Sequence, residues 1–275
     1  MEDARPGRDA PPGSGRPTGT ARGERRRGRR FDGKPKSEQP RSYYGLPVLN
    51  KPVWEAREIA GYFFLGGLAG ASSVVAAGAQ LTGRGSLARA AKVSAAGAAG
   101  LSLAALVKDL GRPRRFLNML RVFKPTSPMS VGTWLLSGYA PAALAAAASD
   151  LTGIAPGLGV AATAGAAMLG PAIASYTGVL IADTAVPAWH DARRELPPLF
   201  VASAATAAAG VGLVATSGRD AVPAQRLALL GVAGELGAGQ MLERRLEAEV
   251  VRAYREGRAQ KLMRLAQLLS VAGAA

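Results

Sequence analysis

The run "IAGYFFLGGLAGASSVVAAGAQL", residues 59–81, contains no charged side chain. The hydrocarbon core of a bilayer is about 30 Å thick, and an α-helix crosses it in roughly 20 residues. A soluble helix with the same composition would need one polar face, and this run has no such periodicity. The run therefore predicts a transmembrane helix and disfavours a large soluble protein built from buried alanine-rich helices.

Further apolar runs of this kind follow along the chain. The sixth is interrupted by Glu235, and the seventh begins near Leu262 and stops at Ala275, where the printed sequence ends. We expect residues 43–275 to form an all-α, polytopic transmembrane helical bundle of about seven spans, C-terminally truncated from roughly eight or more, because a span that ends within lipid leaves unsatisfied carbonyl groups. The predicted spans after the first are 87–107, 128–149, one within 151–182, 196–218, 227–242 and the run from Leu262.

Small residues are expected to bring these helices close together. Gly66 and Gly70 lie four residues apart, and so do Gly157 and Ala161. Such pairs place small side chains on one helix face and allow helix backbones to approach. Arg89 and Lys92 lie near one end of the second span, where we expect them to extend to the interface.

The first 42 residues form a separate polar tail. They contain twelve basic and six acidic side chains among Gly, Pro and Ser, and almost nothing large to bury. No core can offset the entropy of ordering such a segment, so we expect it to be disordered. Its arginines set topology or touch anionic lipid at the bilayer surface.

The distribution of positive charge predicts the orientation in the membrane. The formal net charge is +15, which by itself would suggest a nucleic acid as a partner. However, the basic residues lie in the tail and in short connections between apolar runs. The tail, the connection 108–124 and the segment 243–264 are rich in Arg and Lys and fall on one side if the spans alternate. We therefore predict a multi-pass protein of the inner (cytoplasmic) membrane with a cytoplasmic N-terminus, and no nucleic-acid partner.

The chain has no cysteine and one histidine, His190. It cannot bind an iron–sulfur cluster through thiolates, and it cannot supply the two axial histidines of a membrane b-type haem. Any redox metal must therefore belong to a partner.

Polar side chains at the ends of the spans are candidates for a ligand site. Glu58 and Tyr62 are four residues apart, on one face of a helix. They either hold a quinone carbonyl or, in the case of Glu58, anchor the helix at the interface. Asp109 ends the second span and is followed by Gly111, Arg112 and Pro113. Asp109 either pairs with a neighbouring arginine or relays a proton at the hydrocarbon boundary, and the two roles are compatible.

Other polar groups lie in the second half of the chain. Tyr176 offers a hydroxyl in the fourth span, and Asp183 either titrates beside the bundle interior or only marks the end of that span. His190 is expected to be a surface residue. Glu235, in the middle of an apolar run, predicts a proton path or ion site, with a helix-to-helix hydrogen bond from the protonated acid as the alternative.

Three stretches together resemble the NrfD-like, polysulfide-reductase-type family of integral membrane subunits. They are "YFFLGGLAGAS" from Tyr62, "KDLGRPRRFLNMLRVFKPTSPMSVGTWLL" from Lys108 and "SYTGVLIADTAVPAWHDARRELPPLFVASA" from Ser175. The resemblance covers about residues 50–250. It implies a haem-free membrane anchor that works beside an iron–sulfur (ferredoxin-like) subunit and usually a molybdopterin catalytic subunit. Such anchors exchange electrons, in either direction, between those clusters and menaquinone or ubiquinone.

The resemblance also implies which residues form the quinone pocket or support it. Carried over position by position, these are Tyr62, Asp109, Gly111, Arg112, Pro113, Tyr176 and Asp183. Tyr62 and Asp109 would orient the quinone and assist its protonation. Two alternatives remain, which are a proton- or ion-coupled transporter using Glu235 and Asp183, and a purely structural anchor that does not touch quinone.

Overall fold

The computed structural model describes residues 56–109 and 118–274. The predicted tail, residues 1–42, lies outside the described residues, and so do Gly111, Arg112 and Pro113. The side chains of Glu58 and Asp109 are also outside the description, although both residues belong to helices.

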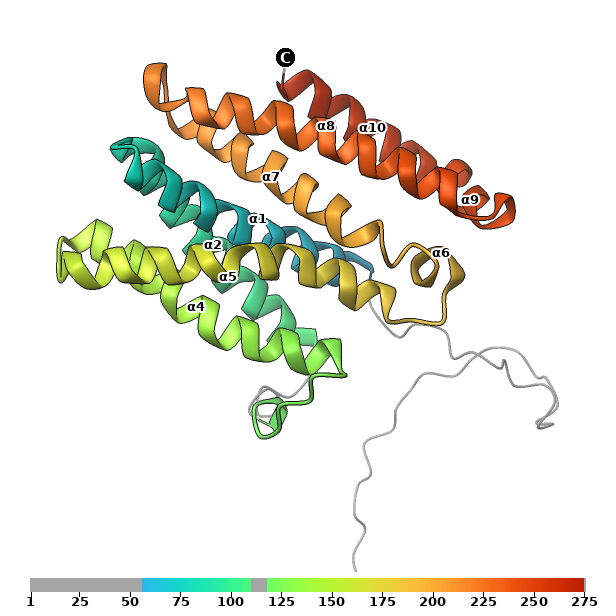
Figure 1. Cartoon of the computed structure of the whole chain (residues 1–275), viewed down its shortest axis with the longest axis horizontal. Helices are drawn as coiled ribbons and strands as arrows, with labels where there is room; N and C mark the ends of the chain where they lie inside the picture. The colour runs from blue at the N-terminus through green and yellow to red at the C-terminus, as the bar shows by residue number, and fades with distance from the viewer. Residues whose placement is uncertain (1–55, 110–117, 275) are drawn as a thin grey trace, which may run out of the picture. The chain divides into compact units, whose positions relative to one another are not determined.

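The described residues form helices and no strand, which confirms the all-α prediction (Figure 1). A short 3₁₀ helix, Gly218–Asp220, precedes α8. The α-helices are α1 (Ala56–Leu81), α2 (Gly85–Asp109), α4 (Pro128–Thr152), α5 (Pro156–Ala182), α6 (Pro187–His190), α7 (Leu196–Ala215), α8 (Val222–Arg245), α9 (Ala248–Arg255) and α10 (Gly257–Ala274).

Proline and glycine fix where these helices begin and end. A proline occupies the first turn of α4, α5, α7 and α8, where its fixed φ suits a helix and its missing N–H costs nothing. Gly153 ends α4 with φ +71°, a left-handed conformation that glycine adopts without strain. The turn between α4 and α5 is therefore short.

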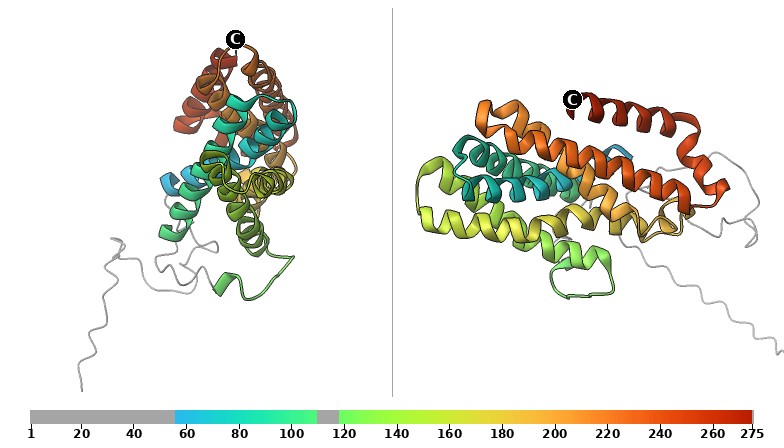
Figure 2. Two further views of the ribbon diagram at one scale, coloured as in Figure 1. Left: turned by 90° about the vertical axis from the view of Figure 1, so that its left-hand side faces the viewer. Right: turned by 45° about the horizontal axis from the view of Figure 1, so that its top comes forward.

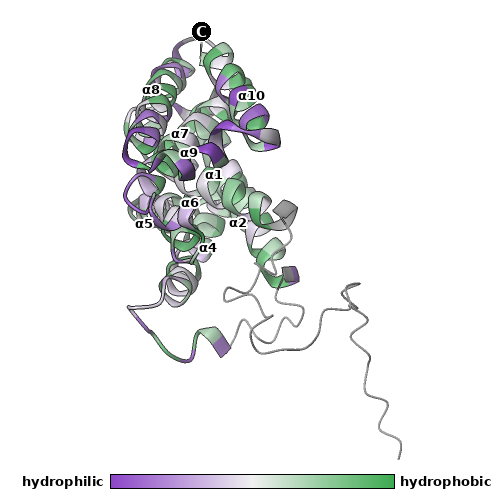
Figure 3. Ribbon diagram, turned by 90° about the vertical axis from the view of Figure 1, so that its right-hand side faces the viewer, coloured by the Kyte–Doolittle hydropathy of each residue, from purple (hydrophilic) through white to green (hydrophobic). Residues whose placement is uncertain are grey.

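Five helices among the described residues are long and apolar enough to cross a membrane, namely α1, α2, α4, α5 and α7. The two remaining predicted spans lie within α8 and α10, which are helical but do not reach the same hydropathy. The reason is compositional, since α8 carries Arg226 and Glu235 and α10 carries several basic and amide side chains. Figure 3 shows this contrast, with hydrophilic segments on α9 and α10 and hydrophobic ones along α2.

Helix α1 lies at the centre of the packing. It contacts α2, α5 and α7, and α4 packs against α5 and α2 on the far side of α1 from α8. Helix α8 packs on α7 and is in turn contacted by α10 (Figures 1 and 2). The first four long helices thus form one bundle, and α7 connects that bundle to a layer made by α8 and α10.

Glycine permits the closest helix contact, between α1 and α5. A Cβ on either Gly70 or Gly170 would collide with the carbonyl oxygen of the other, so the two backbones touch here. Gly66 faces Ser102 and Thr177 at van der Waals distance, which confirms the predicted close-packing face of the first span.

The second predicted small-residue pair was wrong. Gly157 has open space where a Cβ would lie, and Ala161 is exposed. The close approach on this part of α5 is made by Gly159, against the Ser149 side chain of α4. The pattern of four-residue spacing identified small residues but not which face of α5 meets its neighbour.

An ion-pair cluster joins α2 to α4, which corrects the expectation for Lys92. Lys92 is only 7% exposed, and its Nζ lies 2.9 Å from Asp150 Oδ1. Arg89 Nε lies 2.9 Å from Asp150 Oδ2 and remains largely exposed. Lys92 therefore points inward to a carboxylate, because burying an ammonium group without a partner would be costly.

Candidate functional site

Tyr62 and Tyr176 meet at one end of the first bundle. Tyr62 lies near the start of α1 and Tyr176 near the end of α5, and their hydroxyls form a side-chain hydrogen bond. Both side chains are partly buried. Sequence spacing paired Tyr62 with Glu58, whose side chain lies outside the described residues, and did not anticipate the contact between the two tyrosines.

Two further helices position this tyrosine pair. The Tyr176 ring lies against Gly132 of α4, where a Cβ would collide with the ring. On the α2 side, Ser102 Oγ donates a hydrogen bond of 3.4 Å to the Tyr62 carbonyl oxygen. The pair is thus held where α1, α2, α4 and α5 converge. Sequence patterns did not identify Ser102 and Gly132, although a lone glycine between larger residues at the start of a span is a signal for close approach.

The described part of helix α2 reaches Asp109. In an alternating bundle the end of α2 is on the same side as the start of α1 and the end of α5, which carry Tyr62 and Tyr176. The predicted pairing of Asp109 with arginines of the following loop falls on residues outside the description and stays a prediction.

Asp183 occupies the position that ends α5. Its side chain is exposed, and its backbone N–H donates to the carbonyl oxygens of Val179 and Leu180, each at 3.2 Å. Asp183 therefore lies at the end of the span, and its predicted part in a quinone site stays a prediction. His190 ends α6 and is exposed, as expected for a surface histidine.

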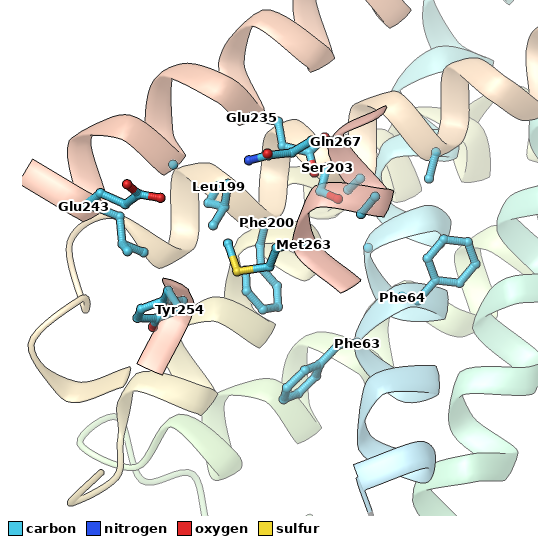
Figure 4. A pocket seen from close by; sticks show the side chains of 16 residues that line it. Phe63, Phe64, Leu199, Phe200, Ser203, Glu235, Glu243, Tyr254, Met263 and Gln267 are labelled. Carbon is cyan, nitrogen blue, oxygen red and sulfur yellow. The ribbon is translucent and has the colours of Figure 1, made fainter. Parts of the chain in front are cut away.

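Aromatic contacts lead from Tyr62 to a pocket beside the first bundle. The Phe63 ring lies 5.7 Å from the Tyr62 ring and 5.8 Å, edge to face, from the Phe200 ring of α7. Phe63 and Phe200 line a pocket of about 310 Å³ between α1, α7, α8 and α10 (Figure 4). Its walls are mainly apolar, so a ligand with an aromatic or alkyl body fits it better than a polar one.

Three polar side chains of this pocket, Glu235, Ser203 and Gln267, lie together (Figure 4). The Glu235 carboxylate makes a side-chain hydrogen bond with Ser203 of α7, and Gln267 of α10 lies beside them in Figure 4. The second oxygen, Oε2, is buried and has no hydrogen-bond partner within the described part of the chain. The contact between Glu235 and Ser203 joins two helices, as in the helix-to-helix alternative, while the free oxygen leaves one acceptor available to a ligand or a proton.

Ion pairs and a hydrogen bond close one end of this pocket. Arg245 Nη1 lies 2.9 Å from Glu195 Oε1, and Arg255 Nη2 lies 2.7 Å from Glu243 Oε2. The Tyr254 hydroxyl donates a hydrogen bond to the Ala188 carbonyl oxygen, and burial raises the pKa of this phenol above its ordinary value. The Tyr254 hydrogen bond holds α9 against α6, and the Arg255–Glu243 ion pair holds α9 against α8.

Hydroxyl groups deep in the first bundle escaped the sequence analysis. Tyr139 is completely buried, and its hydroxyl lies 2.7 Å from Ser73 Oγ. Ser72 and Ser94 form a second hydroxyl contact of 3.1 Å between α1 and α2. Nothing in the spacing of single hydroxyls within alanine-rich runs distinguishes such partners. Over residues 56–109 and 118–274, no group of three metal-binding side chains occurs.

Comparison with family models gives one finding that bears on this arrangement. The model described as "Polysulphide reductase, NrfD" matches residues 47–233, which include α1, α2, α4, α5, α7 and the first half of α8. Comparison with curated proteins gives no match. The matched region covers more than half of the chain and contains both tyrosines of the pair described above. The chain belongs to the NrfD (polysulphide reductase) family of membrane subunits.

Proposed function

We propose that this chain is the membrane anchor and quinone-interacting subunit of an oxidoreductase complex. The observation that carries the proposal is the hydrogen-bonded pair of Tyr62 and Tyr176 at one end of a family-matched bundle. Its partners would be an iron–sulfur subunit and a molybdopterin catalytic subunit, because the chain has no cysteine with which to bind a cluster of its own.

The tyrosine pair fits a quinone by its chemistry. A quinone has an apolar planar ring and carbonyl oxygens that accept hydrogen bonds. A hydrogen bond between two hydroxyls uses one of their two protons, so the pair keeps one O–H to donate. The adjoining Phe63 and Phe200 rings supply an apolar surface for the ring or its tail.

Tyr62 and Tyr176 would orient the carbonyl group, and Asp109 would hold or release a proton at the end of α2. When bound, menaquinone or ubiquinone supplies the transfer of two electrons and two protons. The protein contributes position and a route for protons. Glu58, Gly111, Arg112 and Pro113 would complete the surroundings of the site, and Asp183 would contribute from the end of α5.

The assembled complex provides the test. Asp109→Asn and Tyr62→Phe should slow quinone-linked turnover about tenfold or more, while dye-linked activity of the catalytic subunit stays intact. Exposed Arg252 in α9 has no ion pair within the described part of the chain, so Arg252→Gln is the matched control and should change neither activity. Equal loss of both activities in Asp109→Asn, or of neither, would contradict the role given to Asp109.

We also propose an inner-membrane location with a cytoplasmic N-terminus. The bias of basic residues toward one side supports this orientation. Reporter fusions at the N-terminus and in the turn around Gly153 should report opposite sides of the membrane, and the same side for both would overturn the proposed topology.

A proton- or ion-coupled transporter is the second candidate. The buried Glu235 Oε2 without a partner among the described residues favours it, since an acid in an apolar pocket binds a proton or cation readily. Proteoliposomes containing the chain alone should then show proton or cation flux that Glu235→Gln abolishes. Absence of flux, together with quinone-linked activity in the complex, would exclude the transporter and support the quinone-interacting function.

A further inference from the structure

A groove on the other side of the molecule from Tyr62 lies among α1, α5, α7 and α8. Its volume is about 580 Å³, within the range of small-molecule sites. Alkyl side chains form most of its walls, including Val74, Val75, Val201 and Leu230. Val74 is 44% exposed and Leu230 is 70% exposed, so the groove opens toward the surface that meets lipid.

The groove has the length of one membrane leaflet. Along α1 it runs from Ala71 to Thr82, at the end of that helix. At 1.5 Å per residue this is about 16 Å, and half of a hydrocarbon core of about 30 Å is about 15 Å. A fatty acyl chain that enters from the interface would therefore reach the middle of the bilayer within the groove.

Positive charge is concentrated at the interfacial end. Arg84 follows α1 and Arg226 lies in the first turns of α8, so both lining arginines are at this end. Arg84 Nε donates a 3.4 Å hydrogen bond to the Arg219 carbonyl oxygen, which leaves its terminal nitrogens available. Arg226 is exposed and makes no ion pair with any residue in the described ranges.

Among the residues that the structure describes, no acidic side chain lines the groove. The acid nearest to Arg219 in the sequence is Asp220, and its carboxylate accepts a hydrogen bond from the Ser86 hydroxyl of α2. Neither lining arginine forms an ion pair within the described ranges, and guanidinium groups bind phosphate oxygens in a directed, bidentate way.

We propose that this groove binds an anionic phospholipid of the phosphatidylglycerol type. The acyl chains lie along α1, α7 and α8, and the phosphate is held by Arg84 and Arg226. A free phosphate ion would leave the apolar walls unused, and a zwitterionic lipid such as phosphatidylcholine would bring its quaternary ammonium group beside the two arginines. The site is at the opposite end of α1 from Tyr62 and does not depend on the proposed quinone function.

Native mass spectrometry of the purified full chain in detergent tests the proposal. Added phosphatidylglycerol should give one tightly held adduct and raise the melting temperature, whereas phosphatidylcholine with the same acyl chains should do neither. The double variant Arg84→Gln/Arg226→Gln should weaken phosphatidylglycerol binding at least about tenfold, because charge-assisted hydrogen bonds to the phosphate are lost. Arg252→Gln is the control and should bind the lipid like the unmodified chain.

Three results would overturn the proposal. They are equal binding of phosphatidylcholine, unchanged phosphatidylglycerol binding by the double variant, and equal stabilisation by inorganic phosphate alone. Circular dichroism and elution volume show whether the double variant folds. If it does not, the single variant Arg226→Gln decides, because its side chain loses no ion pair or hydrogen bond to another described residue, and it should weaken lipid binding several-fold.

Discussion

Asp150 and Glu235 are both acids on long helices of this domain, yet their surroundings differ completely. Asp150 receives Lys92 on one oxygen and Arg89 on the other, each at 2.9 Å. Glu235 has Ser203 beside it and one buried oxygen without a partner in the described ranges. The first arrangement pairs both carboxylate oxygens with a cation and joins two helices, whereas the second leaves one carboxylate oxygen free to act. The difference separates an acid that builds the fold from an acid available for chemistry.

The largest loss of stability is expected from breaking the ion-pair cluster that Asp150 forms with Lys92 and Arg89. Asp150→Asn removes the charge opposite Lys92, which is nine-tenths buried, and should lower the free energy of unfolding by about 3 kcal/mol. Thermal unfolding in detergent measures the change. The double variant Lys92→Met/Asp150→Leu removes both charges and should recover most of the loss, because no buried charge is left alone. A double variant as unstable as the single one would mean that the cluster does not act as an ion pair.

A smaller effect is expected from the uncharged contact between Ser73 and Tyr139. Tyr139→Phe keeps the ring in its buried place and removes a 2.7 Å hydrogen bond, so the loss should be about 1 kcal/mol. Ser73→Ala removes the other partner and should cost a similar amount. The double variant should cost less than the sum of both, and full additivity would show that the two hydroxyls do not interact in the folded protein.

Sequence patterns predicted this fold better than they predicted its polar contacts. Uncharged runs locate α1, α2, α4, α5 and α7 because the bilayer demands length and apolarity, which are properties of one segment alone. Partners such as Tyr62 and Tyr176 belong to helices more than a hundred residues apart, and their register depends on packing that only the folded bundle defines. The same reason explains the wrong expectation for Lys92, whose partner Asp150 lies just beyond the predicted span 128–149.

Small residues and span ends fall between the helices, which the sequence predicts well, and the polar contacts, which it does not. Gly66 and Gly70 were assigned correctly because the face they share is also the most crowded face of α1. Gly157 and Ala161 have the same spacing but lie on the exposed side of α5, which no local pattern distinguishes. Asp183 lies at a helix end. From the sequence alone, an aspartate there is equally consistent with a functional acid and with a simple helix terminus.

The smallest effect on stability is expected at Glu235. Glu235→Gln keeps the shape of the side chain and its ability to bond with Ser203, so unfolding should change by no more than about 0.5 kcal/mol. Any consequence should instead appear in a property of the pocket, such as binding of an apolar ligand or proton flux in proteoliposomes. Thermal unfolding of Glu235→Gln should be measured together with that of Asp150→Asn. The comparison is direct because both variants convert an acid to its amide. A loss at Glu235 as large as at Asp150 would show that its carboxylate is held by a structural partner, and the distinction between the two acids would fail.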